Sequence, residues 1–266
     1  TALLITQTGG GCRASNYIKL LRKALVKAGY GNIPVASLNF SGLEKGSGLP
    51  LTLPLLRKVI ASIFYGDMLV ALRSQTYPYE DRRGDADAMT EKWISTIQGW
   101  IRGDKNYSAH DMKKRFYDIA ADYATIPITR VPKVKVGVVG EIYVKYSPLG
   151  NNDLEKFLES QDCEVNLPGL MGFVEYCVAN YRLDIDLYGG NKLVAGGADK
   201  FLGWLDSIGC ASYDAMRKYG FYAPGSFREL MKKPEGIISL GAKMGEGWLL
   251  TAEMIELVEG GYGNIV

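Results

Sequence analysis

The stretch Thr6–Tyr17, which reads Thr-Gln-Thr-Gly-Gly-Gly-Cys-Arg-Ala-Ser-Asn-Tyr, lies between two segments of different character. The apolar run Ala2 to Ile5 before it predicts a strand. After it, apolar residues recur at helical spacing until Gly29, which offers a C-terminal stop for a helix. The stretch is therefore predicted to contain a glycine turn that joins a strand to a helix.

This turn carries a cysteine in surroundings that favour negative charge. Three successive glycines, Gly9, Gly10 and Gly11, allow backbone N–H groups to turn toward a bound group. The helix that follows adds unpaired N–H donors and the positive end of its dipole. Since Arg13 follows Cys12, we expect this thiol to ionise more easily than a free cysteine, whose pKa is about 8.5. Taken alone, the pattern fits equally well a glycine turn with a small, half-buried thiol.

The residues Thr8–Tyr17 resemble a signature of proteins related to the activases and dehydratase components of 2-hydroxyacyl-CoA dehydratases, the 2-hydroxyglutaryl-CoA dehydratase group. Three later segments are similar to the same family, and they are Tyr65-Gly66-Asp67 running to Pro78-Tyr79-Glu80, then Val136–Asn151, then Gly245–Trp248. The resemblance implies a lyase-related protein of anaerobic metabolism. In this family, electron transfer driven by ATP through an iron–sulfur cluster supports the dehydration of an acyl-CoA.

The family also implies what lies beyond this chain. Such proteins are much longer and carry ATPase domains and further cysteine motifs, so we interpret the chain as a piece of one. The expected partners are the remaining domains of the parent chain and an acyl-CoA substrate. Cys12 is the expected metal ligand, of a [4Fe–4S] cluster in the full-length protein. The fragment alone is expected to be inactive and to hold no cluster.

Composition places limits on the function. The chain has 266 residues, a formal net charge of +2 and no basic stripe, which disfavours nucleic acid as a partner. No apolar run approaches the length of about 20 residues that crosses a membrane, and no signal peptide opens the chain. The sequence therefore predicts a soluble, cytoplasmic protein that does not bind membranes.

The remaining cysteines and the single histidine suit few kinds of site. Cys163, Cys177 and Cys210 are scattered and form no C-x-x-C pair, so they are poor ligands to accompany Cys12. We expect burial to raise the pKa of these three thiols. His110 lies in a stretch rich in lysine and arginine and is predicted to be exposed, which argues against a Ser-His-Asp hydrolase.

Further along the chain, hydrophobic patterns predict four more strands and many helices. The strands are expected at Ile33–Phe40, Val134–Ile142, Cys163–Leu167 and Gly263–Val266. Residues of about 49–126 are predicted to be a helical insertion, broken by a charged turn at 77–84. This turn fits a solvated loop, or a segment that faces a site. Residues 182–197 are predicted to be a loop with hairpin or lid character.

Together these elements predict one α/β domain, a doubly wound parallel sheet of flavodoxin-like order 2-1-3-4-5 with a helical insertion. In that order strands 1 and 3 are neighbours at the topological switch point, where such folds bind ligands. Glu141, Tyr143 and Lys145, which follow the third strand, should then lie near the Cys12 loop. The predicted cofactor-binding residues are Gly9, Gly10, Gly11, Cys12, Arg13, Glu141, Tyr143 and Lys145.

Two other classes of function remain open. The glycine turn fits a non-redox site for a nucleotide or the phosphates of CoA, although the fingerprints of ATP and NAD sites are missing. The helical part also fits a module that docks neighbouring domains. Near the C-terminus, Glu246 is expected either to face the predicted crevice or to be a carboxylate favoured by the start of a helix.

Overall fold

A computed structural model describes residues 2–7, 14–39 and 52–266 of the chain. The chain divides into two compact units, Thr1–Leu56 and Arg57–Val266, and each is described by itself. The predicted site residues Gly9, Gly10, Gly11, Cys12 and Arg13 lie outside the described residues.

The first unit contains a strand, a helix and a parallel strand. β1 (Leu3–Gln7) pairs with β2 (Val35–Asn39), with Leu3 opposite Val35. α1 (Ala14–Lys27) packs against both strands and buries Ile18. The strand–helix–strand pattern and the parallel pairing predicted for this part of the chain are therefore confirmed.

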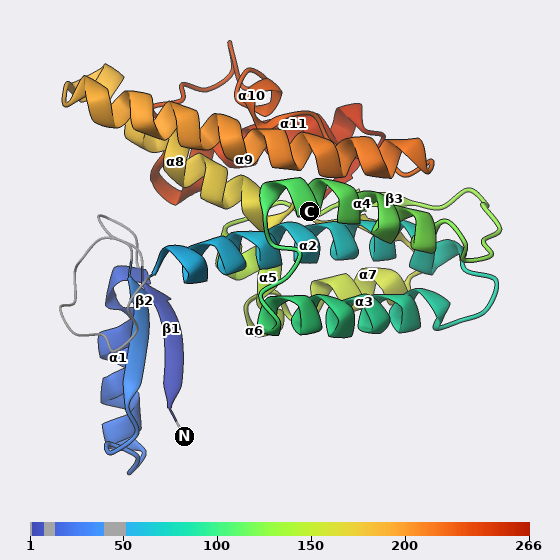
Figure 1. Cartoon of the computed structure of the whole chain (residues 1–266), viewed down its shortest axis with the longest axis horizontal. Helices are drawn as coiled ribbons and strands as arrows, with labels where there is room; N and C mark the ends of the chain where they lie inside the picture. Colours follow the sequence, from blue (N-terminus) through green and yellow to red (C-terminus); the bar gives the residue numbers. More distant parts are fainter. Residues whose placement is uncertain (1, 8–13, 40–51) are drawn as a thin grey trace. The chain divides into compact units, whose positions relative to one another are not determined.

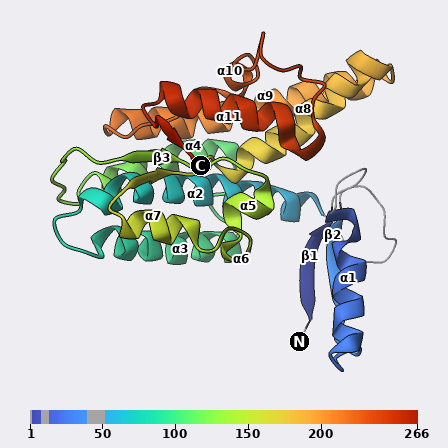
Figure 2. The same ribbon diagram turned by 180° about the vertical axis from the view of Figure 1, so that it is seen from behind.

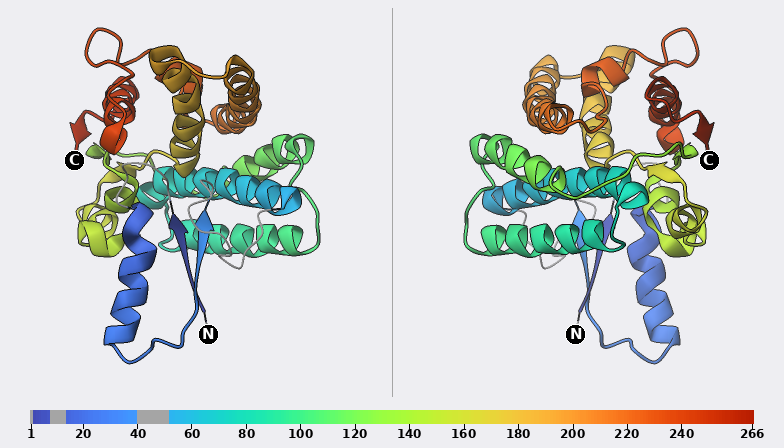
Figure 3. Two further views of the ribbon diagram at one scale, coloured as in Figure 1. Left: turned by 90° about the vertical axis from the view of Figure 1, so that its left-hand side faces the viewer. Right: turned by 90° about the vertical axis from the view of Figure 1, so that its right-hand side faces the viewer.

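The second unit is mostly helical (Figure 1). Its helices are α2 (Leu53–Thr76), whose first residues belong to the first unit, η1 (Tyr77–Tyr79), α3 (Asp85–Arg102), α4 (Ala109–Tyr123), α5 (Ile142–Tyr146), α6 (Pro148–Asn151), α7 (Leu154–Ser160), α8 (Leu170–Tyr188), α9 (Lys192–Lys218), α10 (Phe227–Leu230), η2 (Met244–Glu246) and α11 (Gly247–Glu259). α8, α9 and α11 lie on one side of α2 and α4, and α3 lies on the other (Figure 3).

Aromatic side chains of α2, α3 and α4 pack against one another in the core of this unit. The ring centroids of Tyr65 and Phe116 are 5.6 Å apart, and those of Trp93 and Trp100 are 5.8 Å apart. A second cluster joins α8, α9, α10 and α11 around Trp248, which is fully buried. The C-terminal helical layer therefore has its own apolar centre, beside the helices that the sequence indicated as an insertion.

Three short parallel strands complete this unit. β3 (Lys135–Gly137) lies between β4 (Glu164–Asn166) and β5 (Asn264–Ile265), in the order β4-β3-β5. Figure 2 shows this sheet beside α11, which packs against β3 and β5.

The predicted flavodoxin-like doubly wound sheet is wrong. All five strands occur close to their predicted positions, but they form one sheet of two strands and one of three. A strand has two edges, and both edges of β3 are occupied, by β4 and by β5, so no edge remains for β1. Hydrophobic patterns located the strands, whereas the pairing depended on which segments reached β3.

The predicted loop at 182–197 is also wrong. α8 continues to Tyr188, and α9 begins at Lys192, so only a short turn at Gly189 and Gly190 separates the two helices. Gly189 has φ of +81°, which glycine adopts without strain. Arg182 bonds Asp186 one turn ahead and Asp199 on the neighbouring helix, and these ion pairs hold α8 and α9 together at this end.

Candidate functional site: an acidic cavity beside Lys145

The residues predicted after the third strand lie on α5. Glu141 immediately precedes this helix, Tyr143 is about half exposed, and Lys145 is almost fully buried. They were expected near the Cys12 loop because strands 1 and 3 were expected to be neighbours. Since β1 pairs with β2 and β3 pairs with β4 and β5, that reason no longer holds.

Lys145 instead forms a buried ion pair with Glu253 of α11. Its Nζ lies 2.9 Å from Oε1 and 3.0 Å from Oε2 of Glu253, and the two side chains are only 1% and 3% exposed. Burial raises the pKa of Glu253, and the ammonium of Lys145 opposes that shift. The pair therefore joins α5 to α11 inside the protein.

Glu246 lies beside α5, at its first residue, Ile142. Its backbone is left-handed, with φ of +61°, and its carboxylate accepts a hydrogen bond from the backbone N–H of Ile142. The other carboxylate oxygen, Oε2, is buried and has no hydrogen-bond partner among the described residues. Burial raises the pKa of Glu246 to about 7, against the attraction of Lys145. The segments around Glu141 and Glu246 thus meet within the second unit, and the side chain of Glu246 makes no capping bond to α11.

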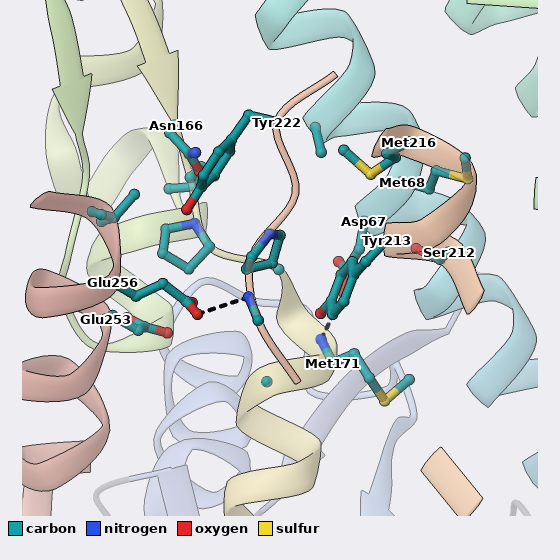
Figure 4. A pocket seen from close by; sticks show the side chains of 18 of the residues that line it. Asp67, Met68, Asn166, Met171, Ser212, Tyr213, Met216, Tyr222, Glu253 and Glu256 are labelled. Atoms are coloured by element: carbon teal, nitrogen blue, oxygen red, sulfur yellow. Dashed lines mark hydrogen bonds between the residues drawn. The ribbon is translucent and has the colours of Figure 1, made fainter. Parts of the chain in front are cut away.

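A cavity of about 100 Å³ lies close to the Lys145–Glu253 ion pair, among α2, α8, α9 and α11. Four carboxyl groups line it, from Asp67, Glu175, Glu253 and Glu256. Figure 4 shows Asp67 and Tyr213 on one side and the two glutamates of α11 on the other. The lining contains no lysine, arginine or histidine, so the cavity is acidic.

Asp67 is held at the start of α8. Its two carboxylate oxygens accept hydrogen bonds from the backbone N–H groups of Leu170, at 2.9 Å, and Met171, at 2.7 Å. Such N–H groups stabilise the carboxylate, but burial outweighs them and raises the pKa of Asp67 to about 6. Gly169 is needed here, since an added Cβ would lie 2.7 Å from Oδ2 of Asp67.

Glu256 and Glu175 differ in their partners. Oε1 of Glu256 accepts a hydrogen bond from the backbone N–H of Gly225 at 3.1 Å, and burial raises its pKa to about 7. Glu175 is only 4% exposed and makes no hydrogen bond or ion pair with any described residue. Burial, with the nearby charges of Asp206 and Asp67, raises its pKa to about 9. This raised pKa favours the protonated form of Glu175 at neutral pH.

The charged turn at 77–84 has structural contacts. Glu80 accepts hydrogen bonds from the backbone N–H groups of Gly84 and Ala86, both at 2.7 Å, at the start of α3. The hydroxyl of Tyr79 is 2.5 Å from Oε2 of Glu164, a carboxylate on β4 that is 1% exposed. This segment stabilises the fold and lines no part of the cavity.

The three described cysteines do not form a metal site. Cys163 is buried beside the small sheet, and Cys177 and Cys210 lie on α8 and α9. Burial raises the pKa of Cys210, as the sequence predicts. Over residues 2–7, 14–39 and 52–266, no three histidine, cysteine, aspartate or glutamate side chains are placed to hold a metal ion.

Sequence reasoning identified Lys145 but not the acidic side chains around it. Glu175 and Glu253 fall within helical patterns and looked like ordinary polar positions. One signal was available, since Glu253 follows Ala252 on a helix whose buried face includes Trp248, Leu249 and Leu257. A carboxylate on such an apolar face must be paired or protonated.

Within the described part of the chain, no helix combines the length and the apolar character needed to cross a membrane. Comparisons of the sequence with protein-family models and with curated proteins, and of the fold with solved structures, give no match.

Proposed function

We propose that this chain is a domain of an iron–sulfur protein related to the 2-hydroxyacyl-CoA dehydratase and activase group, with Cys12 as a cluster ligand. When bound, a [4Fe–4S] cluster would supply one-electron transfer for the ATP-driven dehydration of an acyl-CoA. The proposal rests on the four sequence segments that resemble this family.

The supporting structural observation is the position of Lys145. This residue belongs to the resembling segment Val136–Asn151. It forms an ion pair with Glu253 on α11, the helix that begins within the segment Gly245–Trp248. Its charge also acts on Glu246 of that segment and on Asp67 of the segment that begins at Tyr65. Segments far apart in the sequence therefore contribute to one charged centre, as a shared functional region would require.

The other ligands of a cluster would come from the rest of the parent protein. Cys177 packs against the core cluster around Trp248, and the thiol of Cys210 is made less acidic by burial. Neither environment favours the thiolate that binds iron.

Iron and acid-labile sulfide in the anaerobically purified full-length protein test the proposal. Cys12→Ala should lower both contents, because it removes a thiolate ligand. Cys177→Ala, which removes a thiol on α8, should leave them unchanged. Full iron and sulfide in the Cys12→Ala protein would exclude Cys12 as an essential ligand, and the glycine turn would then be better explained as a site for the phosphates of CoA.

Interdomain docking is a second candidate, and one surface favours it. The tip where α8 meets α9 exposes large apolar side chains, among them Tyr188 at 76% and Leu193 at 85%. Such a cluster is typical of a contact surface. If it docks the rest of the parent chain, Tyr188→Ser with Leu193→Ser should weaken association with the separately expressed remainder, whereas Tyr143→Ser on α5 should not. Equal association of both variants would exclude the tip as the docking surface.

A further inference from the structure

The acidic cavity between α2, α8, α9 and α11 has an excess of carboxyl groups over partners. Lys145 supplies the ammonium for both oxygens of Glu253, and backbone N–H groups reach both oxygens of Asp67 and one oxygen of Glu256. Glu175 receives no hydrogen bond from any described residue, although only 4% of its surface is exposed. The hydroxyl of Ser74, which also lines the cavity, is buried and has no hydrogen-bond partner among the described residues.

An unpaired buried carboxyl group is costly, and a ligand that pairs with it would remove that cost. The sign of such a ligand follows from the lining. Carboxyl groups repel anions, and no lysine or arginine side chain lines the cavity, so phosphate and CoA do not suit it. A cation placed beside Glu175 would also be attracted by Asp67 and Glu256, whose charges act on the neighbouring hydroxyl of Tyr213.

The apolar part of the lining favours an organic cation over a metal ion. Met68, Met171 and Met216 contribute thioethers, and Phe64, Tyr213 and Phe227 contribute rings. Alkyl groups pack well against such side chains, and aromatic rings attract ammonium groups. Among the described residues no three histidine, cysteine, aspartate or glutamate side chains are grouped so that they could hold one metal ion.

The volume limits the ligand to a small molecule. The cavity of about 100 Å³ is smaller than the cavity of about 150 Å³ that holds benzene in an engineered protein, which leaves room for about four non-hydrogen atoms. We propose that this cavity binds a small alkylammonium ion, whose charged group lies beside Glu175 and Asp67 and whose alkyl group packs against the methionines. This site is independent of the iron–sulfur function proposed above.

Propylammonium chloride is the probe for the proposed site, with sodium chloride at equal ionic strength as the reference. In a calorimetric titration at pH 8, propylammonium should bind the 266-residue chain saturably and should also raise its Tm, because the ligand binds only the folded state. Propan-1-ol, which has the same number of non-hydrogen atoms but no charge, should not. Nα-acetyl-lysine methylamide carries the same ammonium on a body too large for a cavity of about 100 Å³, so it should not raise the Tm.

Two variants locate the binding. Glu175→Gln keeps the shape, but its side chain cannot ionise to pair with the bound cation, so it should weaken propylammonium binding by about tenfold or more. Gly172→Leu adds a side chain at the cavity wall, where an added Cβ meets no atom within 4 Å, and should block binding without loss of folding. Glu91→Gln, an exposed glutamate on α3, is the matched control and should bind as the original chain does.

Three results would overturn the proposal. These are the absence of saturable binding, an equal response to propan-1-ol, and unchanged affinity in both Glu175→Gln and Gly172→Leu. The first would leave the cavity as a site for ordered water only.

Discussion

Two regions of the second unit bury a glutamate in opposite ways. Glu164 on β4 accepts hydrogen bonds from the hydroxyls of Tyr79, at 2.5 Å, and Tyr262, at 2.6 Å, and its Oε1 lies 3.2 Å from Nζ of Lys135. Glu175 on α8 is buried to nearly the same extent but has no such partners among the described residues. Burial alone therefore says little about the state of a carboxyl group, and its partners decide whether it stabilises the fold.

The consequences for the neighbouring groups differ as well. Both tyrosines at Glu164 have raised pKa values, because burial and the adjacent carboxylate disfavour their ionisation. Around Glu175 the carboxyl groups themselves have raised pKa values. At the small sheet, the hydrogen bonds of Glu164 join β4 to Tyr79, before α3, and to Tyr262, near the C-terminus. In the cavity, the carboxyl group of Glu175 is left without a hydrogen-bond partner among the described residues and could bind a ligand.

The largest expected effect comes from turning a paired glutamate into an unpaired one. Lys145→Met removes the ammonium and leaves Glu253 buried without its partner, so the free energy of unfolding should fall by about 3–5 kcal/mol at pH 7. Urea denaturation followed by tryptophan fluorescence measures this, because all four tryptophans lie in the second unit.

Lys92→Met is the matched control for this change. It breaks an exposed ion pair in which Nζ of Lys92 lies 2.6 Å from Oδ2 of Asp122, and it should alter the free energy of unfolding by at most about 1 kcal/mol. If the two variants lost the same stability, the buried pair would contribute no more than a surface pair.

A smaller loss is expected at the satisfied network. Glu164→Gln keeps the shape but weakens the charge-assisted bonds from Tyr79 and Tyr262, which should cost about 1–3 kcal/mol by urea denaturation. In the double variant Glu164→Gln with Tyr79→Phe, the free energy of unfolding should fall by less than the sum of the losses in the two single variants, since both changes act on the Tyr79–Glu164 hydrogen bond. Full additivity would mean that this bond contributes nothing.

An effect of the opposite sign, a gain in stability at high pH, is expected at Glu175. Its pKa is raised from 4.5 to about 9 in the folded state. The part of the unfolding free energy that Glu175 contributes through this raised pKa is therefore fully present below about pH 4.5. It is lost as the pH rises toward 9, by up to about 1.4 kcal/mol per pH unit. Glu175→Gln should remove this loss, so stability should decline less from pH 7 to 8.5 than in the original chain.

The exposed substitution Glu91→Gln should leave the pH dependence unchanged. An equally steep decline in Glu175→Gln and in Glu91→Gln would show that Glu175 is already ionised at pH 7, and the contrast with Glu164 would disappear.

The candidate site was only partly predictable. Lys145 was selected from its place after a strand rich in β-branched residues, for a contact with the Cys12 loop, and the structure shows its contact with Glu253 on α11. Nothing local to Glu175 or Asp67 indicates a shared cavity, because these residues come from different helices and meet only when α2 and α8 pack. The role of Cys12 itself stays a prediction, since this residue lies outside the described part of the chain.

The sequence by itself determined where the strands and most of the helices lie, because the alternation and the 3.6-residue spacing of apolar side chains are local properties of the chain. It also placed the parallel pair β1 and β2, whose connection is short. Only the tertiary structure decided that β3 pairs with β4 and β5, that α8 continues through Arg182, and that Glu164 is paired while Glu175 is not. Strand edges and carboxyl groups are satisfied by partners distant in the sequence, and which partner arrives depends on the packing of the whole unit.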